Sequence, residues 1–262
     1  MKVLILKGDA PRHNFFANEI SKIPNIEIKI ISPKRLGNKR LFTMLKKSPK
    51  TFFARVSKYL VYFFIHWNER EKNFFGNKFD FKETIVENIN SEKTIKLVEE
   101  FKPDLIASFG VPIVCDKIIN IPKFGAINLH GGISPEYKGG NTIFWAVFEG
   151  HPEMAGATIH QMISKVDSGI WFSKVYPEIL PNDDECSISC KTFKAATTEF
   201  IRLIKWINEH NQKAVGMEQE GKSALYKADK RNFFVSLKGL ITIPKKLKGI
   251  YLKERIERNY EK

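Results

Sequence analysis

The chain has 262 residues, of which 43% are hydrophobic, and 43 Lys and Arg against 29 Asp and Glu give it a net charge of +14. This hydrophobic fraction excludes a wholly disordered chain, and the length suits one large domain, alone or with a small appendage. No apolar run approaches the ~20 residues of a membrane-spanning helix, and the first apolar run is too short for a signal peptide. Three cysteines fit a reducing cytoplasm better than a disulfide framework.

The positive charge is concentrated in two segments. Residues 34–58 hold nine Lys and Arg and no acidic residue, and residues 227–262 hold eleven Lys and Arg against four acidic residues. The rest of the chain is therefore nearly neutral. Such segments attract nucleic acid, anionic lipid or phosphorylated substrates, and they also serve simply as a solubilising surface. Composition alone leaves these alternatives open.

The chain opens with the pattern of a strand–helix–strand unit. Residues 2–6 form a short apolar run that is typical of a buried strand, and a Gly- and Pro-containing turn follows. Apolar residues then recur at helical spacing up to residue 21, and residues 26–31 predict a second strand. This order favours an α/β fold with a parallel sheet.

Residues 34–75 interrupt the alternation of strands and helices. Their aromatic and aliphatic residues recur at the spacing of one or two amphipathic helices with basic faces. An insertion packed on the core is the favoured interpretation. A helix that lies on a membrane surface is the alternative.

The alternation resumes after residue 83. Short strands are expected at 84–86, 103–108, 125–130, 157–162 and 171–176. Helices are expected after Ser91, a favourable N-cap residue, and over 141–149 and 187–208.

Polar residues occur at the carboxyl ends of two of these strands, where parallel sheets bind ligands. Asn128 and His130 project to the same side because alternate residues of a strand share a face. Asp167 stands in a later turn. Each residue alone is as well explained by a structural role. Together they suit acyl transfer to an amine, since an amide can stabilise an oxyanion and a carboxylate can fix an imidazole tautomer.

Several motifs, in this order, resemble the folate-dependent formyltransferase family: Asn128-Leu129-His130, Pro135-Glu136-Tyr137-Lys138-Gly139, Gly156-Ala157-Thr158-Ile159-His160 and Asp167-Ser168-Gly169. The likeness is clear from about residue 103 to residue 176. The family includes glycinamide ribonucleotide, methionyl-tRNA and sugar-nucleotide formyltransferases. The resemblance implies an α/β, Rossmann-like core with a mostly parallel sheet, a helical insertion and a small C-terminal extension.

The resemblance also implies a site. The family's catalytic residues match Asn128, His130 and Asp167, and its formyl donor is 10-formyltetrahydrofolate. The pterin of the donor is expected against two loops, Phe109-Gly110-Val111-Pro112 and Ser164-Lys165-Val166. Binding of the acceptor is expected at Arg12, His13, Tyr137, Lys138 and Gly139.

The mechanism that the resemblance implies is attack of an acceptor amine on the formyl carbon. Asn128 would donate a hydrogen bond to the oxyanion, His130 would move the amine proton, and Asp167 would orient His130. Most members of the family carry a serine two residues after the histidine, where this chain has Gly132.

We expect a catalytic domain over residues 1–210, with the basic helical insertion at 34–75, and a basic extension over residues 211–262. The extension is shorter than the C-terminal domain of methionyl-tRNA formyltransferases, and glycinamide ribonucleotide formyltransferases lack the insertion. Elimination favours a nucleotide-linked amino-dideoxy sugar as acceptor, for example dTDP-4-amino-4,6-dideoxyglucose, in the synthesis of O-antigen and lipopolysaccharide. The alternatives are a methionyl-tRNA formyltransferase-like enzyme that acts on RNA and a non-catalytic, polyanion-binding relative.

The expected partners are folate and the nucleotide-linked amino sugar, and nucleic acid is disfavoured. A homodimer through the C-terminal segment and peripheral contact with a membrane stay open. Cys186 and Cys190 could share a helix face, but no His or second Cys pair accompanies them, so no metal is expected. The expected location is the cytoplasm.

Overall fold

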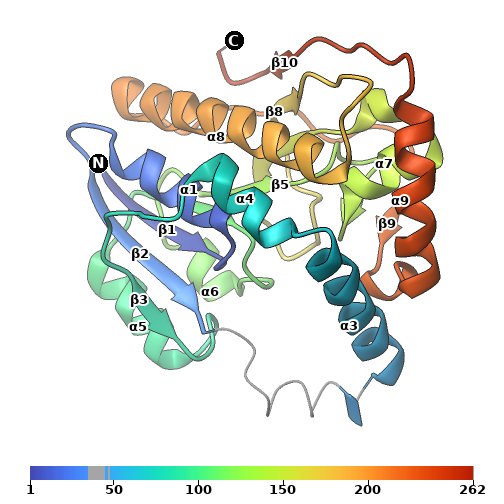
Figure 1. The fold of residues 1–262 in the computed structure, drawn as a ribbon. Helices are drawn as coiled ribbons and strands as arrows, with labels where there is room; N and C mark the ends of the chain where they lie inside the picture. Colours follow the sequence, from blue (N-terminus) through green and yellow to red (C-terminus); the bar gives the residue numbers. More distant parts are fainter. Residues whose placement is uncertain (35–44, 47, 262) are drawn as a thin grey trace.

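The computed structural model describes residues 1–34, 45–46 and 48–261. The remainder of the predicted insertion, residues 35–44 and 47, lies outside the described residues. An eight-stranded sheet with the order β10-β8-β7-β5-β4-β1-β2-β3 forms the centre of the molecule (Figure 1). The predicted α/β class with a mostly parallel sheet is confirmed.

The parallel part of the sheet comes from the first half of the chain. β1 (Lys2–Lys7) lies between β2 (Glu27–Pro33) and β4 (Leu105–Phe109), with β3 (Thr84–Val86) beyond β2 and β5 (Ala126–His130) beyond β4. The central strands are apolar along their whole length because helices cover both faces of a parallel sheet. Because β1, β4 and β5 are parallel neighbours, their carboxyl ends lie together at one end of the strands.

Three antiparallel strands extend the sheet beyond β5. These are β7 (Ala157–Gln161), β8 (Trp171–Tyr176) and β10 (Arg255–Arg258). The sequence analysis did not foresee β10, which places the C-terminal segment at the edge of the main sheet. A separate small sheet pairs β6 (Lys138–Gly139) with β9 (Leu225–Tyr226).

Helices cover the two faces of the sheet in separate groups. α1 (Pro11–Ser21), α4 (Trp67–Phe75) and α8 (Glu185–His210) pack against one another over one face. α5 (Glu92–Phe101) and the short α6 (Asp116–Ile119) cover the other face. A hydrophobic core lies on each face of the sheet, and β1 contributes to both. Val3 and Ile5 point into the core under α1, α4 and α8, whereas Leu4 and Leu6 point into the core under α5 and α6.

Two of these helices begin at caps that the sequence encodes. The Ser91 side chain accepts the N–H of Thr94, as predicted. α8 begins two residues earlier than expected because Asp184 caps it, accepting the N–H of Ser187.

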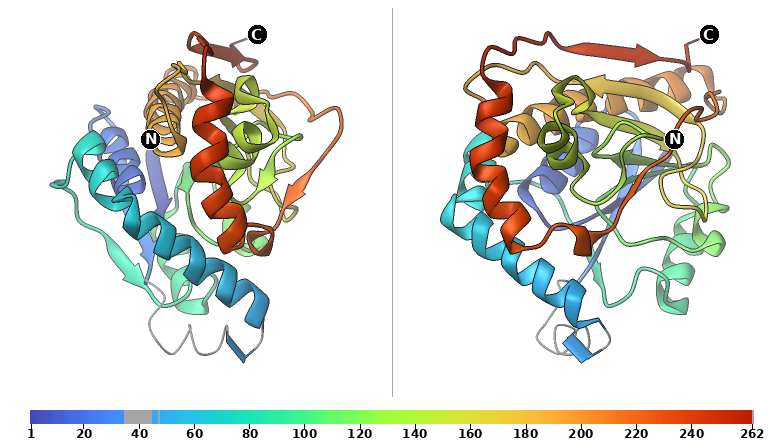
Figure 2. Two further views of the ribbon diagram at one scale, coloured as in Figure 1. Left: turned by 45° about the vertical axis from the view of Figure 1, so that its right-hand side comes forward. Right: turned by 90° about the vertical axis from the view of Figure 1, so that its right-hand side faces the viewer.

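The predicted helices of residues 34–75 are α3 (Pro49–Phe64) and α4. α3 packs against α9 (Phe233–Leu247) and the short 3-10 turn η2 (Ala228–Lys230), and α9 packs in turn on α7 (Thr142–Glu149). Figure 2 shows α3 and α9 side by side on the outside of the molecule. Within the described part of the chain, no helix is both long and apolar enough to span a membrane.

Candidate active site

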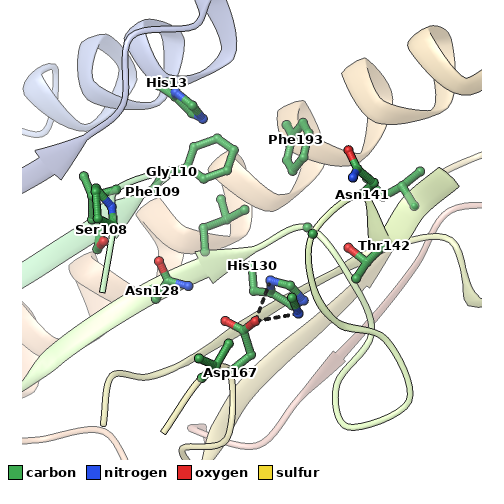
Figure 3. Close-up of a pocket in the computed structure, with 18 of the residues that line it drawn as sticks. His13, Ser108, Phe109, Gly110, Asn128, His130, Asn141, Thr142, Asp167 and Phe193 are labelled. Carbon is green, nitrogen blue, oxygen red and sulfur yellow. Dashed lines mark hydrogen bonds and ion pairs between the residues drawn. The ribbon is translucent and has the colours of Figure 1, made fainter. Parts of the chain in front are cut away.

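A cavity of about 750 Å³ opens at the carboxyl ends of β4 and β5. Its wall is built from the loops after these strands, the start of α1, and parts of α3, α4, α7 and α8. The three residues of the predicted triad all line it. Figure 3 shows Asp167 directed toward His130, with Asn128 on the same strand as the histidine.

The ring of His130 is fixed by a backbone group. Its Nε2 lies 2.8 Å from the carbonyl oxygen of Tyr137, so this nitrogen carries the hydrogen and donates it. Its Nδ1 lies 3.4 Å from Oδ2 of Asp167. Burial lowers the pKa of His130 below its usual value, although the Asp167 carboxylate acts in the opposite direction. The neutral ring therefore keeps a basic Nδ1 beside the carboxylate.

Asp167 is held as a carboxylate. Burial alone would raise its pKa, but the positive charge that His130 carries when protonated, the protonated form of His160, whose Nε2 lies 3.5 Å from Oδ1, and the N–H of Gly139 hold the pKa of this carboxyl well below its usual range. The Gly139 N–H donates to Oδ2 over 2.9 Å. The backbone of Asp167 is left-handed, with a φ of 45°, a conformation that Asp tolerates better than most residues.

His160 is a site residue to which the sequence analysis gave no role. Its Nδ1 donates to the carbonyl oxygen of Gln161 over 2.9 Å, so in the neutral ring Nε2 accepts from the Asn128 amide, 3.2 Å away. One N–H of Asn128 is thus committed and the second stays available. His160 and Asn128 are paired across β7 and β5, a register that the separate strand patterns do not reveal.

The two loops expected to hold the formyl donor both line the cavity. Phe109 to Pro112 and Ser164 to Val166 all line it, together with Ile113 and Met162. Ser164 ties its loop to α6 through a hydrogen bond of 2.8 Å to Asp116. The buried hydroxyl of Ser108 in this wall has no hydrogen-bond partner among the residues that the structure describes.

His13 occupies the junction between the ends of β1 and β4. Its Nδ1 accepts the N–H of Ala10 over 3.2 Å, and its ring lies edge-on to Phe109. Burial, followed by the charges of Arg12 and Lys7, holds the pKa of His13 well below its usual value. A side chain at Gly110 would collide with this ring, so the glycine is required for close packing.

Arg12 lines the part of the cavity wall that α3, α4 and α8 also build, called here the acceptor end. Its Nη1 pairs with the buried carboxylate of Glu71 on α4, and its guanidinium stands 5.6 Å from the centre of the Phe193 ring. Tyr62 and Trp67, from α3 and α4, complete this end and stack on each other with ring centres 4.2 Å apart. The sequence analysis did not assign either aromatic residue to the site.

The remaining predicted acceptor residues differ in placement. Gly139 lines the cavity, but the Tyr137 and Lys138 side chains are not among the lining groups. The Tyr137 ring stacks on Tyr226, and Lys138 Nζ lies 3.0 Å from the Ser168 hydroxyl. Tyr137 reaches the site only through its carbonyl group, which orients His130.

Gly132, where the family usually has serine, lies against the same carbonyl. A Cβ there would collide with the Tyr137 carbonyl oxygen and would lie 2.7 Å from both His130 Nε2 and Thr142 Cβ. The space for a side chain at position 132 is therefore already filled. Within the described residues, no group of three or more His, Cys, Asp or Glu side chains could hold a metal ion.

The family model for formyl transferase matches residues 69–204 of this chain. The bifunctional polymyxin resistance protein ArnA of Wigglesworthia glossinidia brevipalpis is 36% identical over 102 residues, or 38% of this chain. That match spans only 15% of the length of the relative.

Solved formyltransferase structures share the fold. A sugar N-formyltransferase from a Shewanella species has a TM-score of 0.56 at 16% identity, covering 87% of this chain and 76% of the other. A phosphoribosylglycinamide formyltransferase from Anaplasma phagocytophilum has a TM-score of 0.55 at 17% identity, covering 86% and 98%. The formyltransferase PseJ from Anoxybacillus kamchatkensis, solved with UDP-4,6-dideoxy-4-formamido-L-AltNAc and tetrahydrofolate, has a TM-score of 0.52 at 19% identity, covering 95% and 98%.

Proposed function

This chain belongs to the formyl transferase family, and from that premise we propose that it transfers a formyl group from 10-formyltetrahydrofolate to the amino group of a nucleotide-linked amino-dideoxy sugar. The observation that carries the proposal is the meeting of Asn128, His130 and Asp167 on one wall of a single cavity. Amide, imidazole and carboxylate are the groups that acyl transfer to nitrogen requires.

The donor end of the cavity fits a folate. Cavities of a few hundred to about a thousand cubic ångströms bind ligands of this size. The walls there are mostly apolar, as suits a flat ring system, and the unpartnered hydroxyl of Ser108 can hydrogen-bond to the polar edge of a pterin. Phe109 to Pro112 and Ser164 to Val166 would hold that ring, and the bound donor would supply the formyl carbon.

The chemistry follows from the orientation of His130. As the acceptor nitrogen bonds to the formyl carbon and the bond from that carbon to the folate nitrogen breaks, one proton must leave the amine. Nδ1 of His130 takes this proton, because Nε2 is committed to the Tyr137 carbonyl, and returns it to the departing folate nitrogen. Asp167 stabilises the imidazolium formed in between.

Asn128 stabilises the negative charge that develops on the formyl oxygen. Its side-chain amide already donates one hydrogen to His160, which holds the second hydrogen in place for the oxyanion. His160 is therefore a positioning residue in this proposal.

Features at the acceptor end support a nucleotide-linked sugar. Arg12 keeps N–H groups besides the one that donates to Glu71, and these can bind a diphosphate. Tyr62 and Trp67 add an aromatic wall suited to a sugar or base. We propose dTDP-4-amino-4,6-dideoxyglucose as one such acceptor, with a role in the synthesis of O-antigen and lipopolysaccharide.

The test is an acceptor panel. The protein is incubated with 10-formyltetrahydrofolate and with amino-sugar nucleotides, glycinamide ribonucleotide or methionyl-tRNA, and mass spectrometry identifies the formylated product. We expect formylation of an amino-sugar nucleotide. Asn128→Ala and His130→Ala should each reduce kcat by about 10²-fold or more.

Matched controls are Asn208→Ala and His151→Ala, which change the same residue types outside the cavity. Near wild-type turnover in both site variants would refute the assignment of the reaction. Formylation of glycinamide ribonucleotide or methionyl-tRNA alone would refute the acceptor class and leave the reaction standing.

A further inference from the structure

The outward face of α9 is apolar. Gly239 and Ile243 turn inward and are buried, with Gly239 close to the Phe144 ring. On the opposite side, Phe234 is 77% exposed and Ile241 is 59% exposed, with Leu237 on the same flank. A surface helix normally has one apolar side, whereas α9 has two, and only one of them is covered by the described parts of the chain.

The outward face of α3 has the same character. Phe53, Leu60 and Phe64 fall on one stripe at helical spacing, and Phe63 stands beside them. All are exposed, Phe63 by 75% and Phe64 by 72%. α3 and α9 pack side by side (Figure 2), and the exposed apolar side chains of the two helices are together called here the α3–α9 face.

Every charged residue within α3 and α9 is basic, and two acidic residues, Asp183 and Asp184, lie beside Lys245 near the end of α9. Residues 230–253, which include α9, contain seven Lys and Arg and no Asp or Glu, and α3 contains three Lys and Arg and no acidic residue. Lys238 and Lys245 are exposed on α9 beside the apolar side chains. The nearby carboxylate of Asp229 lies 3.9 Å from Lys50 and is paired with it.

We propose that the α3–α9 face docks on the surface of an anionic lipid bilayer. Bulky apolar side chains interspersed with lysines are what an interfacial helix uses, burying the former among acyl chains and setting the latter against lipid phosphates. Extended apolar patches are rare on the free surface of soluble proteins and often mark an interaction site. The proposal does not depend on the proposed activity, since none of the exposed side chains on this face lines the cavity.

The positive charge of the α3–α9 face favours an anionic bilayer over a second copy of the chain as the partner that covers it. A two-fold dimer through the α3–α9 face would place lysines of one subunit against lysines of the other, and the repulsion would oppose it. A bilayer of anionic lipid complements the same charges.

The first measurement uses the unmodified protein in vesicle flotation. We expect it to float with vesicles of phosphatidylglycerol and phosphatidylcholine, to float much less with phosphatidylcholine alone, and to lose binding as salt rises. This measurement does not depend on the folding of any variant.

Two pairs of variants then locate the contact. Lys238→Gln with Lys245→Gln should weaken partitioning by about 25-fold, since each lysine near an anionic surface contributes about fivefold. The matched control is Lys93→Gln with Lys96→Gln, on α5 at the other side of the molecule.

The second pair tests the apolar side chains. Phe234→Ser with Ile241→Ser should weaken partitioning to the vesicles by more than about tenfold. Ile85→Ser with Val215→Ser, equally exposed elsewhere, should leave it unchanged.

The proposal is overturned if the unmodified protein stays unbound at low salt, or if the control pairs lose as much binding as the α3–α9 pairs. It is also overturned if sedimentation shows a dimer that Phe234→Ser with Ile241→Ser dissociates while vesicles bind nothing. That result would assign the face to a second copy.

Discussion

At the scale of single residues, the central feature is that both ring nitrogens of His130 face oxygen atoms. One contact, to the Tyr137 carbonyl, requires a hydrogen on Nε2. The other, to the Asp167 carboxylate, is favourable only when Nδ1 is protonated as well. Asp167 therefore makes Nδ1 a stronger base, while burial of the ring makes it a weaker one. The resulting pKa lies below that of a free histidine, so the base is neutral at physiological pH.

This balance predicts the pH profile of the proposed reaction. Because His130 must be neutral to accept a proton, kcat/KM should rise with pH through its lowered pKa and then level off. Asp167→Asn removes the charge that raises this pKa, so the rise should move to lower pH while the plateau falls by about 10²-fold. Formyl transfer measured across pH with each variant checks both changes.

The control for this profile is Asp116→Asn, which removes a carboxylate from the donor side without altering a neighbour of His130. It should leave the position of the rise unchanged. If the pH at which kcat/KM rises stays the same in Asp167→Asn, or becomes higher, the assigned role of the carboxylate is contradicted.

At the scale of elements, one buried side chain joins the C-terminal segment to the cavity wall. Arg231, between η2 and α9, is 1% exposed and donates to both carboxylate oxygens of Glu185 on α8, over 2.6 and 2.8 Å. It also donates to the Tyr62 hydroxyl of α3, and its guanidinium lies 3.7 Å from the centre of the Phe144 ring. All three partners line the cavity.

Arg231→Met should therefore affect both stability and binding. It leaves the Glu185 carboxylate without its cation, and breaking a buried pair in this way costs about 3–5 kcal/mol of unfolding free energy. The KM of the acceptor should rise more than that of the donor, because Glu185 and Tyr62 lie at the acceptor end. Urea unfolding and steady-state kinetics provide the two measurements.

Lys117→Met serves as the comparison, since it breaks an exposed pair with Glu92 and should cost no more than about 1 kcal/mol. Equal losses in the two variants, or an unchanged acceptor KM in Arg231→Met, would argue against this linking role.

The elements differ in how far the sequence reveals them. β1, β4 and β5 are predictable because strands buried on both faces are continuous apolar runs. β10 is not, because it is short and half-exposed and depends on β8 for its pairing. α9 gives no single periodicity, since it is apolar on two sides.

The site residues divide in the same way. Asn128 and His130 are predictable because they share one strand end, and Asp167 because it follows in the motif order of the family. His160 and Arg231 acquire their roles through partners that are distant in the sequence, across a strand register or 46 residues away at Glu185. Local patterns contain no information about such pairings.

At the scale of the whole molecule, a buried carboxylate on α8 anchors the last two strands of the main sheet. Glu199 of α8 is 1% exposed and accepts hydrogen bonds from the Ser173 hydroxyl on β8, from Arg258 on β10 and from the Tyr260 hydroxyl. Glu199 thus ties β8 and β10 to α8, and β10 covers the edge that β8 would otherwise present to another chain.

Glu199→Ala should loosen the attachment of β8 and β10 to α8. The change leaves Arg258 and two hydroxyl groups without their acceptor, and we expect a loss of about 3–5 kcal/mol of unfolding free energy. Hydrogen exchange should accelerate at the amides of β8 and β10 and stay slow in β1 and β5, since β7 separates those central strands from β8 in the sheet. Glu257→Ala, which breaks an exposed pair with Arg255 on the same strand, should cost no more than about 1 kcal/mol. Uniform acceleration across the sheet would show instead that the carboxylate supports the core as a whole.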